Sequence, residues 1–554
     1  MNDMPPPAAL PTHWIRVLAV AIGLILLALA FRPASHVYDM PMTEDGYYAL
    51  SVARNVAAGR GVTIDGSNLT NGFQPLFTFL QAGAFALAGG DEILAMRLIM
   101  ALGWLFHVGI AILVAAIAGD AWPVVHGQPE KTLRVALAGF LSLAAPLMLN
   151  HAYNGLETGC VMFFYAAIAR WMQLGRDRSW AGLATLGGLV GLLVLARIDA
   201  AFMAVALGLS ELRRSWSRGP ATMLARGAVL GLAALIVSLP WWLYNTINFG
   251  SPMPTSGTAQ QAWALEWLRL EHAEWALRLV LFPWLFAGAH EAAIGINLPI
   301  PAEPGYMTMT MTGFLRTAVL VVIAVVLWRA ARNRTLLHEL AGAAPEEQDL
   351  VRRLREFAVC FGLAFAALFV YYALSFIAYW FYYRYFAPLA LVAFVVVPVL
   401  AARWLAGQDS SPLAIAIVAL LALQIAILAG LAMIGRGLGG NTVYHDQVAL
   451  LQQHVPAEDL VAAGQSGTLG FFRSHVVNTD GKVNREALAY QDRMWDYLRQ
   501  RNIRWFVDWP FYVNKYLGVP LDAKGLPDAE GNGWRLVAER NYFYLYEYTG
   551  PAGR

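Results

Sequence analysis

The side chains best suited to chemistry in this chain are two adjacent carboxylates, Glu44 and Asp45, which follow the first apolar segment. Other polar groups stand at the ends of later apolar segments: Asn150, His151, Asn154 and Glu157; Arg197 and Asp199; and Arg384. A carboxylate can accept the proton of an attacking hydroxyl, and the planar guanidinium of arginine suits the oxygens of a phosphate. These residue types would serve a transfer from a phosphate-bearing donor to a hydroxyl. Converging carboxylates could also hold a divalent cation against the phosphate.

Each group also has a purely structural interpretation. Glu44 and Asp45 could stabilise the start of a helix, because acids favour the first helical turn. Arg197 and Asp199 could pair for stability alone, and Glu157 could cap the helix predicted at 157–174. Arg384 could be an anchor at the membrane surface, with its charge among the headgroups. A functional site is favoured because acids, amides, arginines and aromatics recur on one predicted face of the membrane.

The elements that must position these groups are apolar helices. Of the 554 residues, 58% are hydrophobic and 14% are charged, and the mean hydropathy is +0.50, which is typical of a polytopic membrane protein. A helix needs roughly 17 to 25 apolar residues to cross about 30 Å of hydrocarbon. We therefore expect about eleven spans, at 14–31, 93–118, 135–150, 157–174, 180–197, 199–211, 227–246, 312–329, 357–378, 385–402 and 412–434.

The basic residues predict the orientation of these spans, because short cytoplasmic loops carry an excess of Lys and Arg. With the N-terminus inside, the inside segments are 127–134, 175–178, 213–218, 328–334 and 349–357, and they hold nearly every basic cluster. All the polar groups described above then fall on the outer face, together with the C-terminus.

Three regions outside the spans organise the rest of the chain. The first outer loop, 32–92, is too polar to span, and it contains a predicted interfacial helix and a short apolar helix at 74–90. The large outer loop, 247–311, is rich in tryptophan and could be a lid, an acceptor platform or a mere cover. Short apolar runs separated by turn residues then predict a small α/β domain. The expected domains are 1–435 and 436–554.

Several ordered motifs resemble those of the GT-C glycosyltransferases. The first outer loop of these enzymes resembles the segment TEDGYYALSVARNVAAGRGVTIDGSNLTNGFQPLF of this chain. Their later motifs resemble four further segments of this chain: YNGLETGC, LARIDA, PWWLYNTINFGSPMPTSGTAQ and YYRYFAPL. The resemblance covers most of 36–270 and 371–400, and GQSGTLGFFRSHVVNTDGKVN looks like part of the outer domain of such enzymes. Within this superfamily the sequence is most similar to the mycobacterial-type terminal arabinofuranosyltransferases, which use decaprenyl-phosphate arabinose.

The resemblance implies a role for each candidate residue. Asp45 would be the general base, with Glu44 beside it as a helper or metal ligand, and Arg384 would contact the donor phosphate. The second acidic group would be Glu157, and a divalent cation is a candidate cofactor that Glu157, Glu44 and His151 could hold. The remaining candidate substrate-binding residues are Arg197, Arg54, Asn71, Gln74, Tyr48, Tyr385 and Asp199.

The resulting prediction is an inverting glycosyltransferase of the bacterial inner membrane, with its site and C-terminal domain in the periplasm. It would move a sugar from a polyprenyl monophosphate to a hydroxyl of a glycan, lipid glycan or protein, and nucleic acid is not an expected partner. Arabinofuranose is one candidate sugar, although Gln260 stands where relatives often have Lys and Gln74 where some have His. The alternatives are a lipid-linked sugar transporter or flippase, which predicts paired polar groups near the midplane, and a non-catalytic glycan-binding membrane protein.

Overall fold

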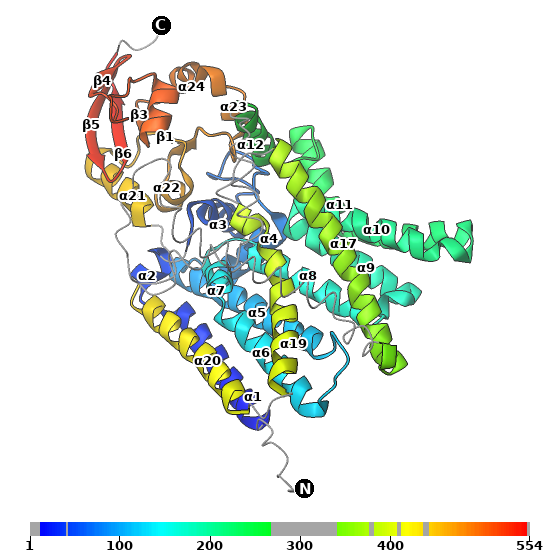
Figure 1. Ribbon diagram of the computed structural model, residues 1–554. Coiled ribbons are helices and arrows are strands. Elements are labelled where there is room, and N and C mark those ends of the chain that lie inside the picture. The colour runs from blue at the N-terminus through cyan, green and yellow to red at the C-terminus, as the bar shows by residue number, and fades with distance from the viewer. Residues whose placement is uncertain are drawn as a thin grey trace.

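A bundle of long helices carries a small β-sheet at one end, and α1 (Thr12–Ala28) lies at the opposite end of the bundle (Figure 1). The computed structural model describes residues 12–39, 42–266, 341–375, 382–406, 411–435 and 442–550. The core of the bundle includes buried apolar side chains of α5 (Glu92–Gly119), α8 (Thr158–Gln173) and α9 (Trp180–Ala196), such as Ile110, Ile168 and Leu193.

Six helical segments in the described part of the chain are long and apolar enough to cross a membrane, and they coincide with six of the predicted spans. They involve α1 (Thr12–Ala28), α5 (Glu92–Gly119), α11 (Pro220–Phe249), α17 (Pro345–Ser375), α19 (Ala390–Ala406) and α20 (Ser411–Met433). A seventh span is formed if α6 (Gly127–Ala144) and α7 (Pro146–Tyr153) are taken together. The pair bends at Ala145, whose extended backbone is expected before a proline.

The other predicted spans are shorter helices or fall outside the described residues. The helices α8 (Thr158–Gln173), α9 (Trp180–Ala196) and α10 (Ala201–Ser215) have 16, 17 and 15 residues. At 1.5 Å per residue they are roughly 22 to 26 Å long, somewhat less than the hydrocarbon thickness. The predicted span at 312–329 and most of the loop at 247–311 lie outside the described residues. The count of eleven therefore stays a prediction.

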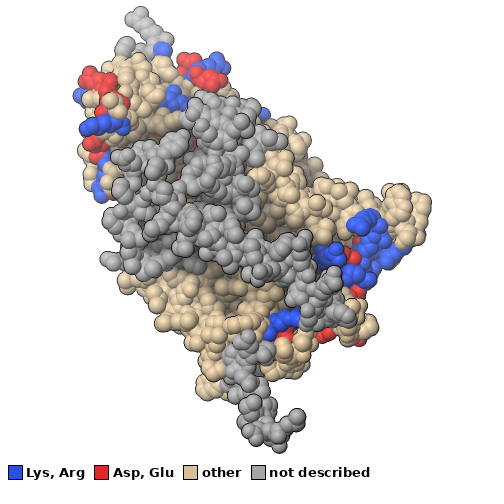
Figure 2. Space-filling model, in the orientation of Figure 1, with Lys and Arg blue, Asp and Glu red and all other residues tan. Residues whose placement is uncertain are grey.

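Three segments predicted to share the cytoplasmic face do meet at one end of the bundle. Arg178 donates to Glu356 at 2.8 Å, and Arg214 lies 3.8 Å from the same carboxylate. Arg214 also contacts Asp177 at 2.5 Å. Figure 2 shows Lys and Arg gathered toward the right and again over the sheet at the upper left, whereas the described surface that is visible between them carries few charges.

The first outer loop contains α2 (Ala34–Asp39), α3 (Glu44–Ala57) and α4 (Pro75–Ala88). The N-terminal cap of α3 is Thr43, whose Oγ1 accepts a hydrogen bond from the Gly46 N–H at 3.1 Å. Ten of the fourteen residues of α3 are buried, because α4 packs on one side of it and α22 (Gly467–Phe472) on another. The helix therefore lies inside the molecule, between the bundle and the sheet.

Residues 442–550, called here the C-terminal sheet unit, form a six-stranded sheet in the order β2-β1-β3-β6-β5-β4. The strands β1 (Val461–Ala463), β2 (Val476–Asn478) and β3 (Trp505–Asp508) are parallel, and Ala462 is in register with Val477 and Phe506. The strands β4 (Glu530–Gly531), β5 (Trp534–Arg540) and β6 (Phe543–Tyr548) are antiparallel. The flanking helices are α21 (Thr442–His454), α22, α23 (Arg485–Leu488), α24 (Met494–Gln500) and α25 (Pro510–Tyr512).

The loops at the carboxyl ends of β1 and β2 pack against α3. Tyr48 of α3 donates to the Gly464 carbonyl at 3.1 Å, just after β1. Asn478, at the end of β2, donates to the same hydroxyl at 3.3 Å. In parallel sheets this edge is where loops commonly contact ligands. Here it faces the helical bundle.

Candidate functional site

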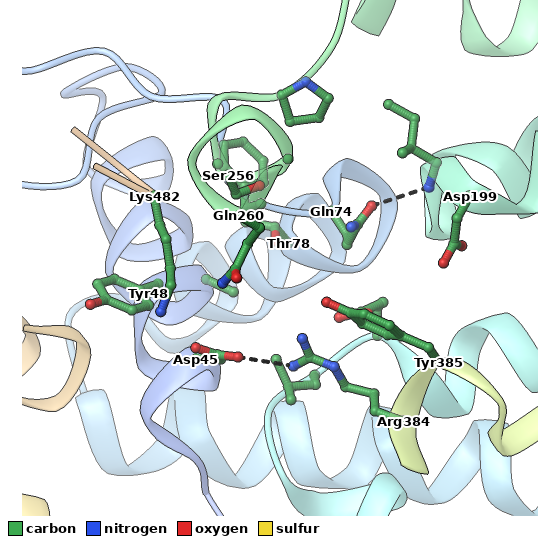
Figure 3. Close-up of a pocket in the computed structure, with 18 of the residues that line it drawn as sticks. Asp45, Tyr48, Gln74, Thr78, Asp199, Ser256, Gln260, Arg384, Tyr385 and Lys482 are labelled. Atoms are coloured by element: carbon green, nitrogen blue, oxygen red, sulfur yellow. Dashed lines mark hydrogen bonds and ion pairs between the residues drawn. The ribbon is translucent and has the colours of Figure 1, made fainter. Parts of the chain in front are cut away.

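A cavity of about 370 Å³ lies where α3 and α4 meet α12 (Thr255–Glu266), α18 (Tyr382–Tyr385) and the C-terminal sheet unit (Figure 3). Its polar lining residues are Asp45, Tyr48, Gln74, Thr78, Glu157, Asp199, Ser256, Gln260, Tyr371, Tyr372, Arg384, Tyr385 and Lys482. The structure therefore brings together candidates that are far apart in the sequence, from Asp45 to Tyr385.

Asp45 and Arg384 face each other in this cavity. The Asp45 Oδ2 lies 3.3 Å from the Arg384 Nη1, although the two residues are 339 positions apart in the sequence. Their side chains are 25% and 11% exposed, so both reach the cavity while protein shields most of their surface. Attraction between charges is stronger in such surroundings than in bulk water. The pair can present a proton acceptor and a phosphate-binding group to one substrate.

Arg197 organises the wall behind this pair. Its Nη2 lies 2.5 Å from Asp199 and its Nε 4.0 Å from Glu157. Its Nη1 donates to the Arg384 carbonyl at 3.3 Å. The guanidinium also lies 4.2 Å from the centre of the Tyr385 ring. Arg197 is buried and does not line the cavity, so its contacts suit it to hold the lining residues in place.

Two stacked tyrosines form an aromatic wall of the cavity. The rings of Tyr372 and Tyr385 lie 4.9 Å apart with an interplanar angle of 21°. The Tyr372 hydroxyl donates to Asp199 at 2.6 Å, which fixes the first ring. An aromatic ring with an anchored polar end offers a rigid apolar surface to a ligand. Tyr372 was not among the residues predicted from the sequence.

Glu44 points away from the cavity, toward the C-terminal sheet unit. One carboxylate oxygen accepts the Gly467 N–H, and the other accepts the Thr468 N–H at 2.8 Å and the Thr468 hydroxyl at 2.6 Å. Burial raises the pKa of Glu44 to about 7, although these donors act in the opposite direction. Tyr48, one helical turn later, points its hydroxyl into the same unit (Figure 3). Glu44 and Tyr48 therefore join the bundle to the sheet, and Asp45 between them faces the cavity.

Three other predicted residues lie outside the cavity lining. Arg54 contacts Glu92 at 2.6 Å and lies 4.4 Å from the Phe471 ring centre. The Asn71 side chain accepts the Thr255 N–H at 3.0 Å and donates to Asn245. His151 is buried, and its Nδ1 lies 3.2 Å from the Asn154 amide nitrogen.

The remaining predicted residues line the cavity. Gln74 accepts the Ile198 N–H at 3.3 Å and thereby ties the first outer loop to the end of α9. Glu157 is the N-cap residue of α8, but its side chain makes no capping hydrogen bond, so the structure does not support a simple capping role.

Lys482 is the charged lining residue that was not predicted from the sequence. It belongs to the turn NTDGKVN after β2. Its position after a predicted strand was a usable signal, because loops at the carboxyl ends of parallel strands share one edge. The sequence did not show that this edge of the sheet faces the helical bundle.

The donor set does not fit the predicted divalent cation. Among the residues that the structure describes, no three His, Cys, Asp or Glu side chains converge as a metal site would require. Both Glu44 oxygens face donors of α22, and Asp45 is paired with Arg384.

Comparison with solved structures finds a similar fold among GT-C glycosyltransferases. ArnT from Cupriavidus metallidurans, solved bound to undecaprenyl phosphate, is 16% identical with a TM-score of 0.50, and the alignment covers 98% of this chain and 100% of that one. At this identity the likeness shows the fold alone.

Two other solved structures are more distant. The oligosaccharyltransferase AglB from Archaeoglobus fulgidus, in complex with an inhibitory peptide and a dolichol-phosphate, has a TM-score of 0.47, 15% identity and coverage of 90% and 70%. The arabinosyltransferase EmbB from Mycobacterium smegmatis has a TM-score of 0.34, 12% identity and coverage of 83% and 45%. These values are too low to support a special closeness to arabinosyltransferases.

Sequence comparisons are less informative than the fold. Residues 438–550 match a family model described as a domain of unknown function, DUF8728. No match is found among curated proteins.

Proposed function

We propose that the protein is an inverting glycosyltransferase that moves a sugar from a polyprenyl monophosphate to a hydroxyl acceptor. The observation that carries the proposal is the Asp45–Arg384 pair, 3.3 Å apart in a cavity between membrane-length helices and the C-terminal sheet unit. A lipid donor needs a site at this boundary, because its chain stays in the bilayer while its sugar meets a polar acceptor. The shared fold with a structure that binds undecaprenyl phosphate supports this donor class.

In the proposed reaction the Asp45 carboxylate takes the proton of the acceptor hydroxyl as its oxygen attacks the anomeric carbon. The new carbon–oxygen bond forms while the bond to the phosphate oxygen breaks, and that oxygen keeps the electron pair. Arg384 stabilises the phosphate as its charge develops. Attack opposite the leaving phosphate inverts the anomeric centre. The phosphate leaves without protonation, so the reaction needs no second carboxyl as general acid, unlike a glycosidase.

The finer parts of the proposal concern the orientation and the substrates. We place the chain in a bacterial inner membrane with eleven spans and with the cavity and the C-terminal sheet unit in the periplasm. The cluster of Arg178, Arg214 and Glu356 supports this orientation, because it brings three of the five predicted cytoplasmic segments together on one side. Arabinofuranose is a candidate sugar, and the acceptor is a glycan, a lipid glycan or a protein.

The decisive experiment is sugar transfer by purified protein in lipid nanodiscs, with a panel of synthetic polyprenyl-phosphate sugars and hydroxyl acceptors. Asp45→Asn should lower the rate by about 10²- to 10⁴-fold, the usual contribution of general base catalysis. Asp91→Asn is a matched control, because Asp91 is an exposed N-cap residue and Asn caps a helix equally well. Normal turnover by the Asp45 variant would contradict the assignment. Movement of intact donor across vesicles without any product would favour a transporter.

A further inference from the structure

Lys482 reaches the cavity from the C-terminal sheet unit. Its amine points toward Asp45, on the side of that carboxylate away from Arg384 (Figure 3). The Lys482 Nζ lies 3.1 Å from Asp480, and the lysine side chain is 20% exposed. A lysine seldom gives up this much hydration, because its charge favours water. Its placement beside Asp45 therefore calls for an explanation beyond the packing of the sheet.

The backbone around Lys482 is held from both sides. Asp480 accepts the Lys482 N–H at 2.9 Å, and Asn484 donates to the Asn478 carbonyl at 2.9 Å. The Lys482 carbonyl packs directly on Gly72 of the first outer loop, where a Cβ would lie only 2.0 Å away. The lysine therefore projects from a fixed turn rather than from a loose surface loop.

Lys482 keeps its positive charge in this position. Burial alone would lower its pKa, but the carboxylates of Asp480 and Asp45 more than offset that effect, so the pKa lies above its usual value. An ammonium group has three N–H donors, and the contact with Asp480 uses one direction. The others can serve a ligand in the cavity that Lys482 lines.

We propose that Lys482 and Arg384 together form a two-cation site for the phosphate of the donor, so that the C-terminal sheet unit contributes directly to substrate binding. The inference rests on the proposed function and deepens it. The ligand chemistry is a phosphate group, either the esterified phosphate of a lipid headgroup or free inorganic phosphate. In this structure Lys482 is paired with the carboxylate of Asp480, and Arg384 is paired with that of Asp45. An arriving phosphate would share the cations and release Asp45 toward the acceptor.

The test is binding of undecaprenyl monophosphate to the full-length protein in nanodiscs, with inorganic phosphate as a separate ligand. Lys482→Met should weaken lipid binding by about tenfold or more, the usual loss for one charge-assisted hydrogen bond. Lys482→Arg should bind within a few-fold of the wild type, since it restores the charge. Lys524→Met is the matched control, because Lys524 is an exposed turn residue of the same unit. It should bind like the wild type.

The outcomes separate this inference from the proposed function. If Lys482→Met binds the lipid normally while Arg384→Met is weakened, the two-cation site is wrong and the proposed function stands. If the wild type binds no lipid phosphate and transfers no sugar, the proposed function itself fails. Inorganic phosphate bound with the same dependence on Lys482 would support the site with free phosphate as its ligand. Thermal unfolding is measured first, and Lys482→Gln serves as the test variant if the methionine variant does not fold.

Discussion

Gly72→Ala offers a direct test of how the C-terminal sheet unit sits on the bundle. The added Cβ would lie 2.0 Å from the Lys482 oxygen and 3.0 Å from its carbonyl carbon. A carbon and a carbonyl oxygen approach to about 3.3 Å at closest, so the turn must retreat by roughly 1.3 Å. Overpacking of this kind usually costs about 1 to 3 kcal/mol. The clash involves backbone atoms, so no side-chain rotation can relieve it.

The retreat should reduce activity more than stability. A displacement of about 1 Å at a binding group can cost up to roughly a hundredfold in rate. We therefore expect sugar transfer to fall about 10- to 100-fold, with a modest decrease in unfolding temperature. Amide hydrogen exchange at 479–484 should accelerate, because the turn loses its packing against the first outer loop. The assays are the initial rate of transfer and hydrogen exchange followed by mass spectrometry.

Gly83→Ala is the matched control for this substitution. Gly83 lies within α4, and a Cβ there would meet no atom within 4 Å. Alanine in a helix interior is better than glycine by about 0.5 to 1 kcal/mol, so this variant should be as stable as the wild type or slightly more stable. Normal exchange at 479–484 and normal transfer in Gly72→Ala would refute the packing of Lys482 on Gly72.

Two further predictions concern buried charges. Burial raises the pKa of Glu44 from its ordinary 4.5 to about 7, so the folded chain binds this proton more tightly than the unfolded chain. The contribution of Glu44 to the free energy of unfolding is therefore largest at low pH and declines as the pH rises from about 4.5 to 7. Glu44→Gln should flatten this part of the pH profile of thermal unfolding. An unchanged profile would contradict the raised pKa of Glu44. Arg197→Met removes the cation shared by Asp199 and Glu157 and should cost about 3 to 5 kcal/mol, measured as a lower unfolding temperature. The exposed Arg213→Met is its control, and equal stability of the two variants would argue against the network.

The membrane helices were largely predictable because span length and apolar content are local properties. Six predicted spans coincide with helices that satisfy both conditions. The basic loops also indicated which helix ends share a side, and Arg178, Arg214 and Glu356 now lie together. The helices α8 and α9 are slightly shorter than their predicted spans, and α10 begins and ends later than its predicted span, because charged and turn residues beside an apolar run do not reveal where a helix ends.

The candidate site was predictable in part. Asp45, Glu157 and Arg384 were named from residue type and resemblance, and all three line the cavity. The roles of Arg54 and Asn71 were not visible in the sequence, because their partners Glu92 and Asn245 are distant in the chain. A polar residue in a motif can position a site without touching it. Only the set of contacts distinguishes the two cases.

The sequence by itself determined that carboxylates and arginines gather at one end of a set of apolar helices, since helix length and charge pattern are written locally. It could not decide between Glu44 and Asp45. Adjacent helical residues point about 100° apart, so which of the two carboxylates faces the cavity depends on where α22 packs. Glu44 binds the backbone of α22, and Asp45 lines the cavity. The position of Lys482 in the cavity depends on the order of the parallel strands and on the contact of its carbonyl group with Gly72. Both are long-range consequences of packing, and for that reason only the tertiary structure could decide them.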